Sequence, residues 1–472
     1  MRLAMRRLAS PLAVVLLAAV AMAADDAKPQ PSAEEIERIR AALPAAPTVA
    51  PAAPRRVLVM TPSRDFYHTN IPYAARTFEL MGEKTGAFTA VASDDLRLFA
   101  PDKLAGFDAV IMDNTTLRLP LVATDLDKRP AAERQALEAE EQLLRQGLLD
   151  FVRNGKGLVG VHAATDCFYD WPEYGDMMGA YFSGHPWSET VTVKIDDPGH
   201  PLMKAFKGTR FAVNDEIYQF REPYSRDTLR VLLSLDTTAT NMDKGANIRR
   251  TDGDFAVAWI HEFGKGRVFY FSLGHRHEIF WNRPILQCYL DGIQYALGDL
   301  KVDATPSAKL TPEYLEQSRQ DGVRAGLDAT FADFAGYRLA VDDSDARRLA
   351  DLIIAALDPA RAAERADLSQ RLAAVIARPE ATPDCRQFAC RQLSLVGNAA
   401  AVPALAALLP DADSGQMARY ALERIPGPEA DQALIKALAT LKDAALIGAI
   451  NSLGVRRTAA AIPPLCERLA SP

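Results

Sequence analysis

Short apolar runs alternate with helical segments over residues 57–162, and this alternation constrains the fold more than any other feature of the chain. Residues 71–85 and 131–153 carry apolar side chains at the spacing of an amphipathic helix. Strands that alternate with helices predict a parallel sheet that is covered by helices on both faces. The runs that we interpret as its strands are VLVMT (57–61), FTAVAS (88–93), DAVIMD (108–113) and GLVGVH (157–162).

Strand-like runs also dominate the segment that follows, residues 190–273. Gly264-Lys265-Gly266 joins two of them as a hairpin turn. Residues 283–298 then close the domain as a helix with apolar side chains at helical spacing. We therefore expect a parallel sheet with an antiparallel extension, built from TVTVKI (190–195), FAVNDEIYQF (211–220), RVLLSL (230–235), FAVAWIHEF (255–263) and GRVFYFSL (266–273).

Polar and titratable side chains follow three of the predicted parallel strands. In such sheets, ligands bind beyond the carboxyl ends of the strands, so these positions are candidates for a site. Asp and Asn at such places also cap helices and make turns, which is the alternative for Asp113 and Asn114. The residues concerned are Arg64, Asp65, Tyr67 and His68, then Asp113, Asn114 and Thr115, and finally His162, Thr165 and Asp166.

All seven histidines lie between His68 and His277, so the chain has none beyond that point. Imidazole is the side chain that titrates near neutral pH and is the commonest metal ligand, which places any such chemistry in the first part of the chain. We expect structural roles for His200, before a turn, and for His261, within a strand. The net charge of -7 argues against a general nucleic-acid binder, which needs a basic surface.

Residues 1–23 have the pattern of a secretory signal peptide, with a basic start, a short apolar run and a small-x-small cleavage site at Ala21-Met22-Ala23. We therefore expect an exported protein, in the bacterial periplasm or outside the cell, and no stable membrane span. Residues 24–54 are interpreted as a linker with a short helix within 33–43. The five cysteines are odd in number and contain no CxxC, so they are expected to be free or buried thiols.

Several segments, in order along the chain, together resemble the ThuA-like (trehalose-utilisation) family over residues 55–299. That family has a flavodoxin-like α/β fold related to the cysteine-type, class I glutamine amidotransferases, and the resemblance implies this fold here. The segments that carry it are GKGLVGVHAATDCFYDWPEYGDMMGAYFSGHPW, HPLMKAF, NDEIYQF and AWIHEFGKGRVFYFSLGH.

The resemblance also argues against one activity. Those amidotransferases carry a nucleophilic cysteine in a G-x-C-x-G turn, and the equivalent turn here is Gly160-Val161-His162-Ala163-Ala164. A thiolate attacks an amide because it is nucleophilic at neutral pH, and the imidazole of His162 does not replace it in that role. Cys167 lies five residues further on, past this turn. We therefore do not expect a glutaminase.

Five residues could converge over the strand ends: His68, His162, His185, Glu216 and His275. One imidazole with one carboxylate suffices for general acid–base chemistry, and we name His162, His68, Glu216 and His185 as catalytic candidates. Two or three imidazoles with a carboxylate also suit zinc or another divalent ion, with His162, His185 and His275 as candidate ligands. The candidate substrate-binding residues are Tyr67, Asp113, Asn114, Asp166, Trp171, Trp187, Tyr218 and His275.

Aromatic side chains are dense around His162 and His185, and either core packing or a wall that stacks on sugars accounts for them. The family name implies a carbohydrate substrate, trehalose or an oxidised 3-keto-sugar. Three functions stay open at this point. They are acid–base or metal-assisted chemistry on a sugar or keto-sugar, carbohydrate binding without catalysis in an assembly, and metal-dependent glycoside hydrolysis.

The last part of the chain is rich in Ala and Leu, and we divide it into a connector, 300–345, and helical repeats, 346–472. Gly397, Gly427 and Gly454 mark turns at a spacing near 30 residues, which is typical of an α-solenoid that resembles short HEAT-like repeats. Such arrays present surfaces to protein partners. The pair Arg456-Arg457 is expected to be solvated.

Overall fold

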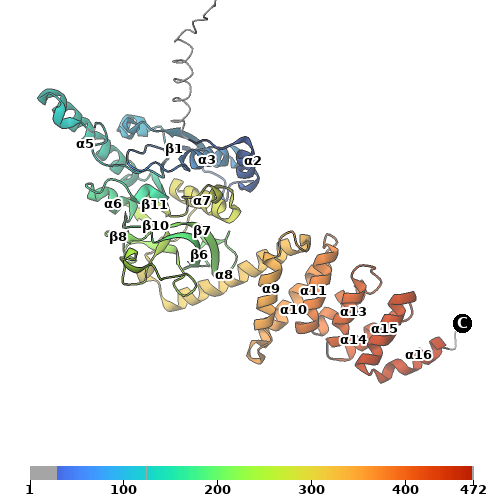
Figure 1. The fold of residues 1–472 in the computed structure, drawn as a ribbon. Helices are drawn as coiled ribbons and strands as arrows, with labels where there is room; N and C mark the ends of the chain where they lie inside the picture. Colours follow the sequence, from blue (N-terminus) through green and yellow to red (C-terminus); the bar gives the residue numbers. More distant parts are fainter. Residues whose placement is uncertain (1–28, 124, 470–472) are drawn as a thin grey trace, which may run out of the picture. The chain divides into compact units, whose positions relative to one another are not determined.

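The computed structural model describes residues 29–123 and 125–469 and divides into two compact units, one up to Arg324 and one from Ala325. The predicted signal peptide, residues 1–23, lies outside the described residues. The first unit is built on a mixed sheet and the second is helical, which confirms an α/β domain followed by a helical region (Figure 1). None of the described helices is both long and apolar enough to span a membrane.

The sheet of the first unit has nine strands, and their pairing changes from parallel to antiparallel about half-way across the sheet. Five strands are parallel, in the order β2-β1-β3-β4-β11, and four continue the sheet antiparallel, in the order β10-β9-β6-β7. The parallel strands are β1 (Arg56–Met60), β2 (Thr89–Ser93), β3 (Ala109–Asp113), β4 (Gly157–Val161) and β11 (Gly266–Phe271). The others are β6 (Trp187–Ile195), β7 (Arg210–Ile217), β9 (Arg230–Leu235) and β10 (Ala256–Phe263), and β5 (Tyr181–Phe182) pairs with β8 (Phe220–Arg221) in a separate ribbon.

Helices cover both faces of the parallel strands because alternate side chains of each strand point to opposite faces. Val57 and Val59 belong to one buried cluster, whereas Leu58 and Met60 belong to another. The first cluster is covered by α2 (Ala33–Ala42), α3 (Ile71–Thr85) and α7 (Arg283–Leu297). The second is covered by α4 (Pro101–Leu104), α5 (Ala131–Arg153) and α6 (Pro172–Met178).

The segment that we interpreted as a linker, residues 24–54, is partly integrated into the first unit. Ile39 of α2 is fully buried, and the Tyr73 hydroxyl of α3 donates to Glu35 at 3.1 Å. Further on, Thr48 N donates to the side-chain oxygen of Gln294 at 2.8 Å. The apolar and polar contacts of this segment therefore add it to the fold, although its Ala- and Pro-rich composition is typical of a linker.

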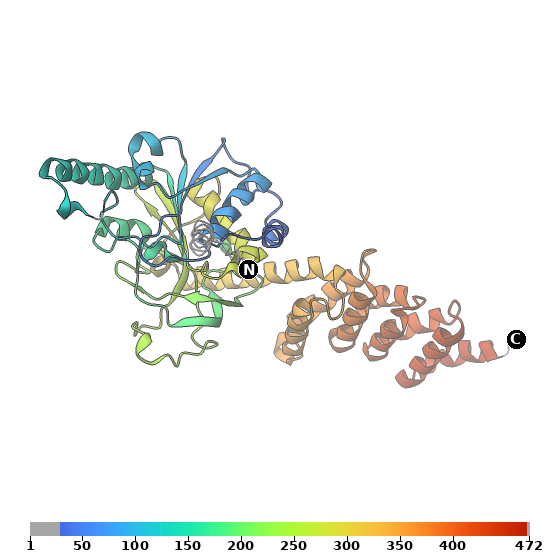
Figure 2. The ribbon, with the colours of Figure 1, turned by 45° about the horizontal axis from the view of Figure 1, so that its top comes forward.

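The second unit consists of short helices, and contacts join a helix to the next but one along the chain as well as to direct neighbours (Figure 2). Its core is made of small and medium aliphatic side chains from successive helices, such as Leu372, Leu393 and Leu422. The helix α8 (Pro312–Asp333) begins in the first unit and ends in the second, within the segment predicted as a connector. The helices that follow are α9 (Ser344–Ala355), α10 (Ala362–Ile376), α11 (Pro383–Val396), α12 (Val402–Leu408), α13 (Gly415–Arg424), α14 (Pro428–Ala437), α15 (Asp443–Arg456) and α16 (Ile462–Leu469).

Candidate functional site

Three histidines meet beyond the carboxyl ends of the parallel strands. His68 follows β1, His162 follows β4 directly, and His275 follows β11. The ring centroid of His68 lies 5.4 Å from the centroids of His162 and His275, and the centroids of His162 and His275 are 5.2 Å apart. The parallel register brings these strand ends to one edge of the sheet, so residues far apart in the chain become neighbours.

Glu216 reaches the same point from β7, the antiparallel edge strand. Its Oε2 atom lies 3.4 Å from His162 Nε2 and 3.5 Å from His275 Nδ1. One ligand atom from each of His68, His162, Glu216 and His275 can be chosen so that all four lie within 4.8 Å of one another. We call these four residues the histidine–glutamate cluster.

The protonation of His162 follows from its contacts. Its Nδ1 lies 2.7 Å from the carbonyl oxygen of Ser272, and because a carbonyl oxygen only accepts, Nδ1 carries the proton. A neutral ring then presents the lone pair of Nε2 to the carboxylate of Glu216. Two acceptors that face each other at this distance repel, unless a cation or a proton lies between them.

His162 also adopts a backbone conformation that suits a residue held in place for function. Its φ angle is +44°, in the left-handed region that side chains with a Cβ rarely occupy. Such strain costs on the order of 1–3 kcal/mol and persists where the surroundings fix the residue. The turn from β4 into the short 3₁₀ helix His162–Thr165 therefore aims this ring into the cluster.

The electrostatics of the cluster favour neutral imidazoles beside an ionised carboxylate. Burial lowers the pKa of His68 to about 3 and that of His275 to about 4, and the proximity of the other imidazoles, which disfavours a second positive charge, adds to the effect. Burial raises the pKa of Glu216, but the proximity of His162, His275 and His185 outweighs it, and the net pKa is lowered. Neutral imidazoles and a carboxylate are the forms that bind metal ions.

The cluster fits a divalent cation. His68 Nδ1, His162 Nε2 and His275 Nδ1 are buried and have no hydrogen-bond partner within the described part of the chain. Zinc takes nitrogen and oxygen ligands at about 2.0–2.2 Å in tetrahedral sites, which places ligand atoms about 3.3 Å apart. The two measured separations from Glu216 Oε2 are close to this value. The hydrogen bond to Ser272 fixes the tautomer of His162, as outer contacts of metal-binding histidines do.

His185 lies outside the ligand group, although we named it as a candidate ligand. Its Nδ1 is 3.3 Å from the other carboxylate oxygen of Glu216, Oε1, and its side chain is 54% exposed. One carboxylate oxygen of Glu216 thus faces the cluster, and the other faces the accessible imidazole of His185. This arrangement separates a buried group of ligands from a group that can exchange protons with a substrate and with water.

The buried carboxylate of Asp215, which is not among the candidate residues, anchors the loop that carries His275. Asp215 accepts hydrogen bonds from three consecutive backbone N–H groups, those of Gly274, His275 and Arg276, at 2.7, 3.3 and 2.8 Å. Strand alternation points Asp215 away from Glu216, so β7 provides a ligand on one face and an anchor for the His275 loop on the other. The sequence alone does not reveal this role, because the three N–H groups belong to a loop about 60 residues away in the chain.

The candidate substrate-binding residues divide into those near the cluster and those in the core. Tyr218 packs on His162 with ring centroids 4.2 Å apart, and Asp166 accepts from the Tyr169 hydroxyl at 2.6 Å. Tyr67 is half-buried on the loop that carries His68, where burial and the charge of Asp113 raise its pKa.

Four other predictions need correction or a narrower role. Trp171 and Trp187 are 2% and 0% exposed, and the Trp187 indole donates to Asn241 O, so a ligand cannot reach either ring. Asp113 is fully buried and accepts from the Asn114 side chain at 2.9 Å, so this pair lies behind the site.

The remaining histidines have structural partners. His200 Nε2 lies 3.1 Å from Asp303 O, and His261 Nε2 lies 3.0 Å from Met177 O, in agreement with the roles expected for them. His277 stacks on Tyr73, with ring centroids 3.9 Å apart, and so turns away from the cluster.

The five cysteines are all free, and four of them are buried. The thiol of Cys167, the one nearest to His162 in sequence, donates to Thr115 O at 2.9 Å. Burial raises the pKa of Cys167 to about 12, which keeps the thiol protonated at neutral pH. A protonated, buried thiol is not a nucleophile.

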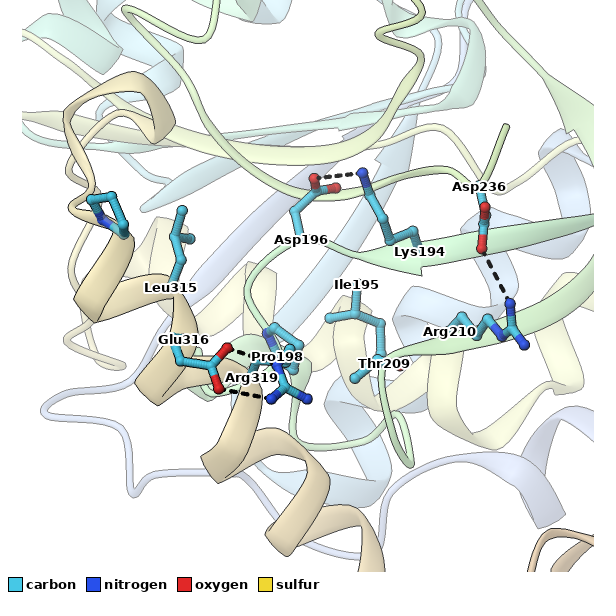
Figure 3. A pocket seen from close by; sticks show the side chains of 11 residues that line it. Lys194, Ile195, Asp196, Pro198, Thr209, Arg210, Asp236, Leu315, Glu316 and Arg319 are labelled. Carbon is cyan, nitrogen blue, oxygen red and sulfur yellow. Dashed lines mark hydrogen bonds and ion pairs between the residues drawn. The ribbon is translucent and has the colours of Figure 1, made fainter. Parts of the chain in front are cut away.

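A separate pocket lies away from this chemistry, against β6, β7 and the first turns of α8 (Figure 3). Its volume is about 750 Å³, and charged residues in its walls pair with one another, as Arg319 does with Glu316 at 2.7 Å and Arg210 with Asp236 at 3.6 Å. No histidine lines it. We therefore place the candidate site at the histidine–glutamate cluster.

Comparison with known proteins gives one family match and several similar solved structures. The family model ThuA, described as trehalose utilisation, matches residues 56–296, just over half of the chain. A ThuA-like protein from Bacteroides uniformis is 22% identical, with a TM-score of 0.41, and the match covers 56% of this chain and 99% of that protein. A ThuA-like protein from Parabacteroides merdae is 16% identical, with a TM-score of 0.35 and coverages of 55% and 100%. No curated protein matches the chain.

Proposed function

Since the chain belongs to the ThuA family, we propose that it is an enzyme that acts on a sugar or keto-sugar by acid–base chemistry assisted by a divalent metal ion, zinc or a similar ion. The ligands are the four residues of the histidine–glutamate cluster. The observation that carries the proposal is a set of three buried imidazole nitrogens around one carboxylate oxygen, for which the described residues provide no hydrogen-bond partner. The family's link with trehalose utilisation supports the choice of a carbohydrate.

In this proposal, the histidine–glutamate cluster binds the ion, and His185 transfers a proton. A divalent ion at such a site supplies polarisation of a carbonyl or hydroxyl oxygen. His185, which is accessible and faces Glu216 Oε1, takes the proton from the carbon beside a keto group, and the electron pair of that C–H bond moves towards the carbonyl. Glu216 stabilises the imidazolium that forms. Elimination, isomerisation and hydrolysis of keto-sugars all begin with such a step or with its equivalent on water.

The proposal excludes glutaminase activity. A cysteine nucleophile needs a thiolate, and Cys167 is buried, hydrogen-bonded to Thr115 and raised in pKa to about 12. His162 occupies the turn after β4 instead. Its ring is engaged by Ser272 on one side and by the cluster on the other.

Metal content and turnover test the function together. The purified full chain is analysed for bound metals and then incubated with trehalose and with 3-keto-trehalose, and the products are followed. We expect about one divalent ion per chain, turnover of the keto-sugar, and loss of both in His162→Ala. Sugar binding without turnover, unchanged in His162→Ala, would show a carbohydrate-binding protein instead. Cleavage of trehalose itself would show a metal-dependent glycoside hydrolase.

We also propose that the chain is exported and that its helical unit is a HEAT-like solenoid that binds a protein partner. The signal-like residues 1–23 support export, and the spacing of glycines near 30 residues supports the solenoid. Fractionation of the producing cells tests the first point, since an exported protein is recovered from the periplasm or the medium. Recovery only from the cytoplasm would contradict it.

A further inference from the structure

One aromatic side chain at the mouth of the candidate site is left in solvent. Phe66 is 61% exposed, more than any other aromatic residue among those that the structure describes. It precedes His68 by two residues, and its ring meets the His68 ring edge-on, with centroids 4.8 Å apart. Burial of an apolar surface is favourable by about 25 cal/mol per Å², and an exposed ring does not contribute this free energy. A ligand that covers the ring at this place would recover that free energy.

The position of Phe66 is fixed by its backbone. Its carbonyl oxygen accepts hydrogen bonds from the Ser63 hydroxyl at 2.7 Å and from the Thr116 hydroxyl at 2.6 Å. Arg64 N also donates to Thr116 O at 3.0 Å, which ties the same loop to the segment after β3. Because these contacts anchor the backbone and not the ring, the loop holds the exposed ring at the site without burying it.

Phe66 begins a continuous row of rings that passes through the cluster. From Phe66 and His68 the row continues to His162, then to Tyr218 at 4.2 Å and to Phe182, whose centroid lies 4.3 Å from that of Tyr218. At its far end, the Phe182 ring stacks on the accessible imidazole of His185 at 5.9 Å and 17°. The buried cluster is therefore flanked by accessible rings on two sides, Phe66 and the His185–Phe182 pair.

The charges near these rings favour a neutral ligand. Arg118 lies beside Tyr169, with its guanidinium 4.6 Å from the ring centroid. That guanidinium is 3.5 Å from the carboxylates of both Asp65 and Asp166, and it donates to Asp166 O at 3.1 Å. One guanidinium thus lies beside two carboxylates, so Arg118 has no unpaired positive charge to attract an anionic ligand. A neutral molecule with hydroxyl groups and an apolar C–H face matches this combination of aromatic rings and paired charges.

We propose that Phe66 is a substrate-binding residue that stacks on the apolar C–H face of a pyranose ring and places that ring between itself and His185, above the histidine–glutamate cluster. This inference rests on the proposed function, since it names the sugar ring as the part of the substrate that the site recognises. It adds a residue that binds substrate without binding metal.

The test measures trehalose binding and metal content in the same samples. Saturation-transfer NMR and titration calorimetry on the metal-loaded full chain compare wild type, Phe66→Ala and Phe66→Trp. Tyr420→Ala serves as the matched control, because Tyr420 is an exposed aromatic residue of the helical unit. We expect Phe66→Ala to weaken binding about tenfold, or ~1.4 kcal/mol, with metal content unchanged. Phe66→Trp keeps the affinity, and Tyr420→Ala changes nothing.

The outcomes separate this inference from the proposed function. Wild-type affinity and turnover in Phe66→Ala would overturn the role of Phe66 and leave the proposed function intact. Loss of metal in Phe66→Ala would also overturn it, because the ring would then act through His68. A wild-type chain that binds no trehalose and does not turn over 3-keto-trehalose would contradict the proposed function, and the role of Phe66 with it.

Discussion

Two buried polar sites, one in each unit of this protein, differ in whether their side chains have hydrogen-bond partners. In the helical unit, Arg456 is only 9% exposed, and its guanidinium donates to Asp431 and to the carbonyl oxygens of Leu422 and Ile425, among others. In the α/β unit, buried nitrogens of the histidine–glutamate cluster have no hydrogen-bond partner among the residues that the structure describes. A buried polar group without a partner costs on the order of 1–3 kcal/mol. At Arg456, polar burial therefore stabilises the helical unit, whereas at the histidine–glutamate cluster it prepares a site for a ligand.

The largest effect should come from removing the carboxylate of the cluster. Glu216→Gln keeps the shape of the side chain but loses its charge, and we expect turnover of a keto-sugar to fall about 10³-fold with loss of the bound metal. The matched control is Glu423→Gln in the helical unit, where the carboxylate accepts from the Ser452 hydroxyl at 2.7 Å and from Arg424 at 3.3 Å. Equal turnover in the two variants would contradict the division of roles between the units.

The next effect concerns stability and is confined to the helical unit. Arg456→Ala leaves several carbonyl groups and Asp431 without their donor, and we expect a loss of about 3 kcal/mol in the free energy of unfolding. All four tryptophans lie between Trp171 and Trp281, so their fluorescence reports the α/β unit alone, and far-UV circular dichroism reports both. The dichroism transition should move, while the fluorescence transition stays. No change in either would restore the expectation of a solvated arginine.

A substitution of Asp215 tests whether its hydrogen bonds position the loop that carries His275. Asp215→Asn replaces a carboxylate that accepts from three N–H groups by an amide with only one acceptor atom. We expect metal affinity to fall about 100-fold, the upper range for residues that support metal ligands. Competition with a chelator measures this affinity. Asp215→Glu should recover part of it, whereas a purely structural role would lower the melting temperature of both variants without changing the affinity.

The smallest effect is a pH dependence that only the α/β unit should show. Burial lowers the pKa of His261 to about 4, below the value of about 6.5 in an unfolded chain. Between these values the unfolded state binds more protons, so stability is present at neutral pH and falls as the pH drops from 6.5 towards 4. From pH 7 to pH 5 this residue alone contributes a loss of about 2 kcal/mol.

Urea unfolding followed by tryptophan fluorescence at the two pH values measures this loss. His261→Gln removes the titrating ring but keeps an N–H donor for Met177 O, and it should reduce the pH dependence. An identical dependence in this variant would assign the effect to other groups.

The sequence predicted the strand ends better than the side chains around them. His68 and His162 were expected together because both directly follow parallel strands, whose carboxyl ends share one edge. The density of aromatic residues favoured Trp171 and Trp187 as substrate-binding residues. Density does not predict burial, however, and both side chains belong to the core. Phe66 carried no signal at all, since an isolated aromatic residue in a loop has no periodicity to read.

By itself, the sequence determined the mixed α/β domain, the helical region that follows it, and the restriction of histidine chemistry to the first of these. Such features follow from local periodicity and composition, which depend on residues only a few positions apart. The tertiary structure alone decided that Glu216 shares one oxygen with the cluster and the other with His185, and that Asp215 anchors the loop of His275. These contacts join residues that are between 31 and 60 positions apart in the chain, and their geometry exists only when the antiparallel strands have joined the parallel strands in one sheet.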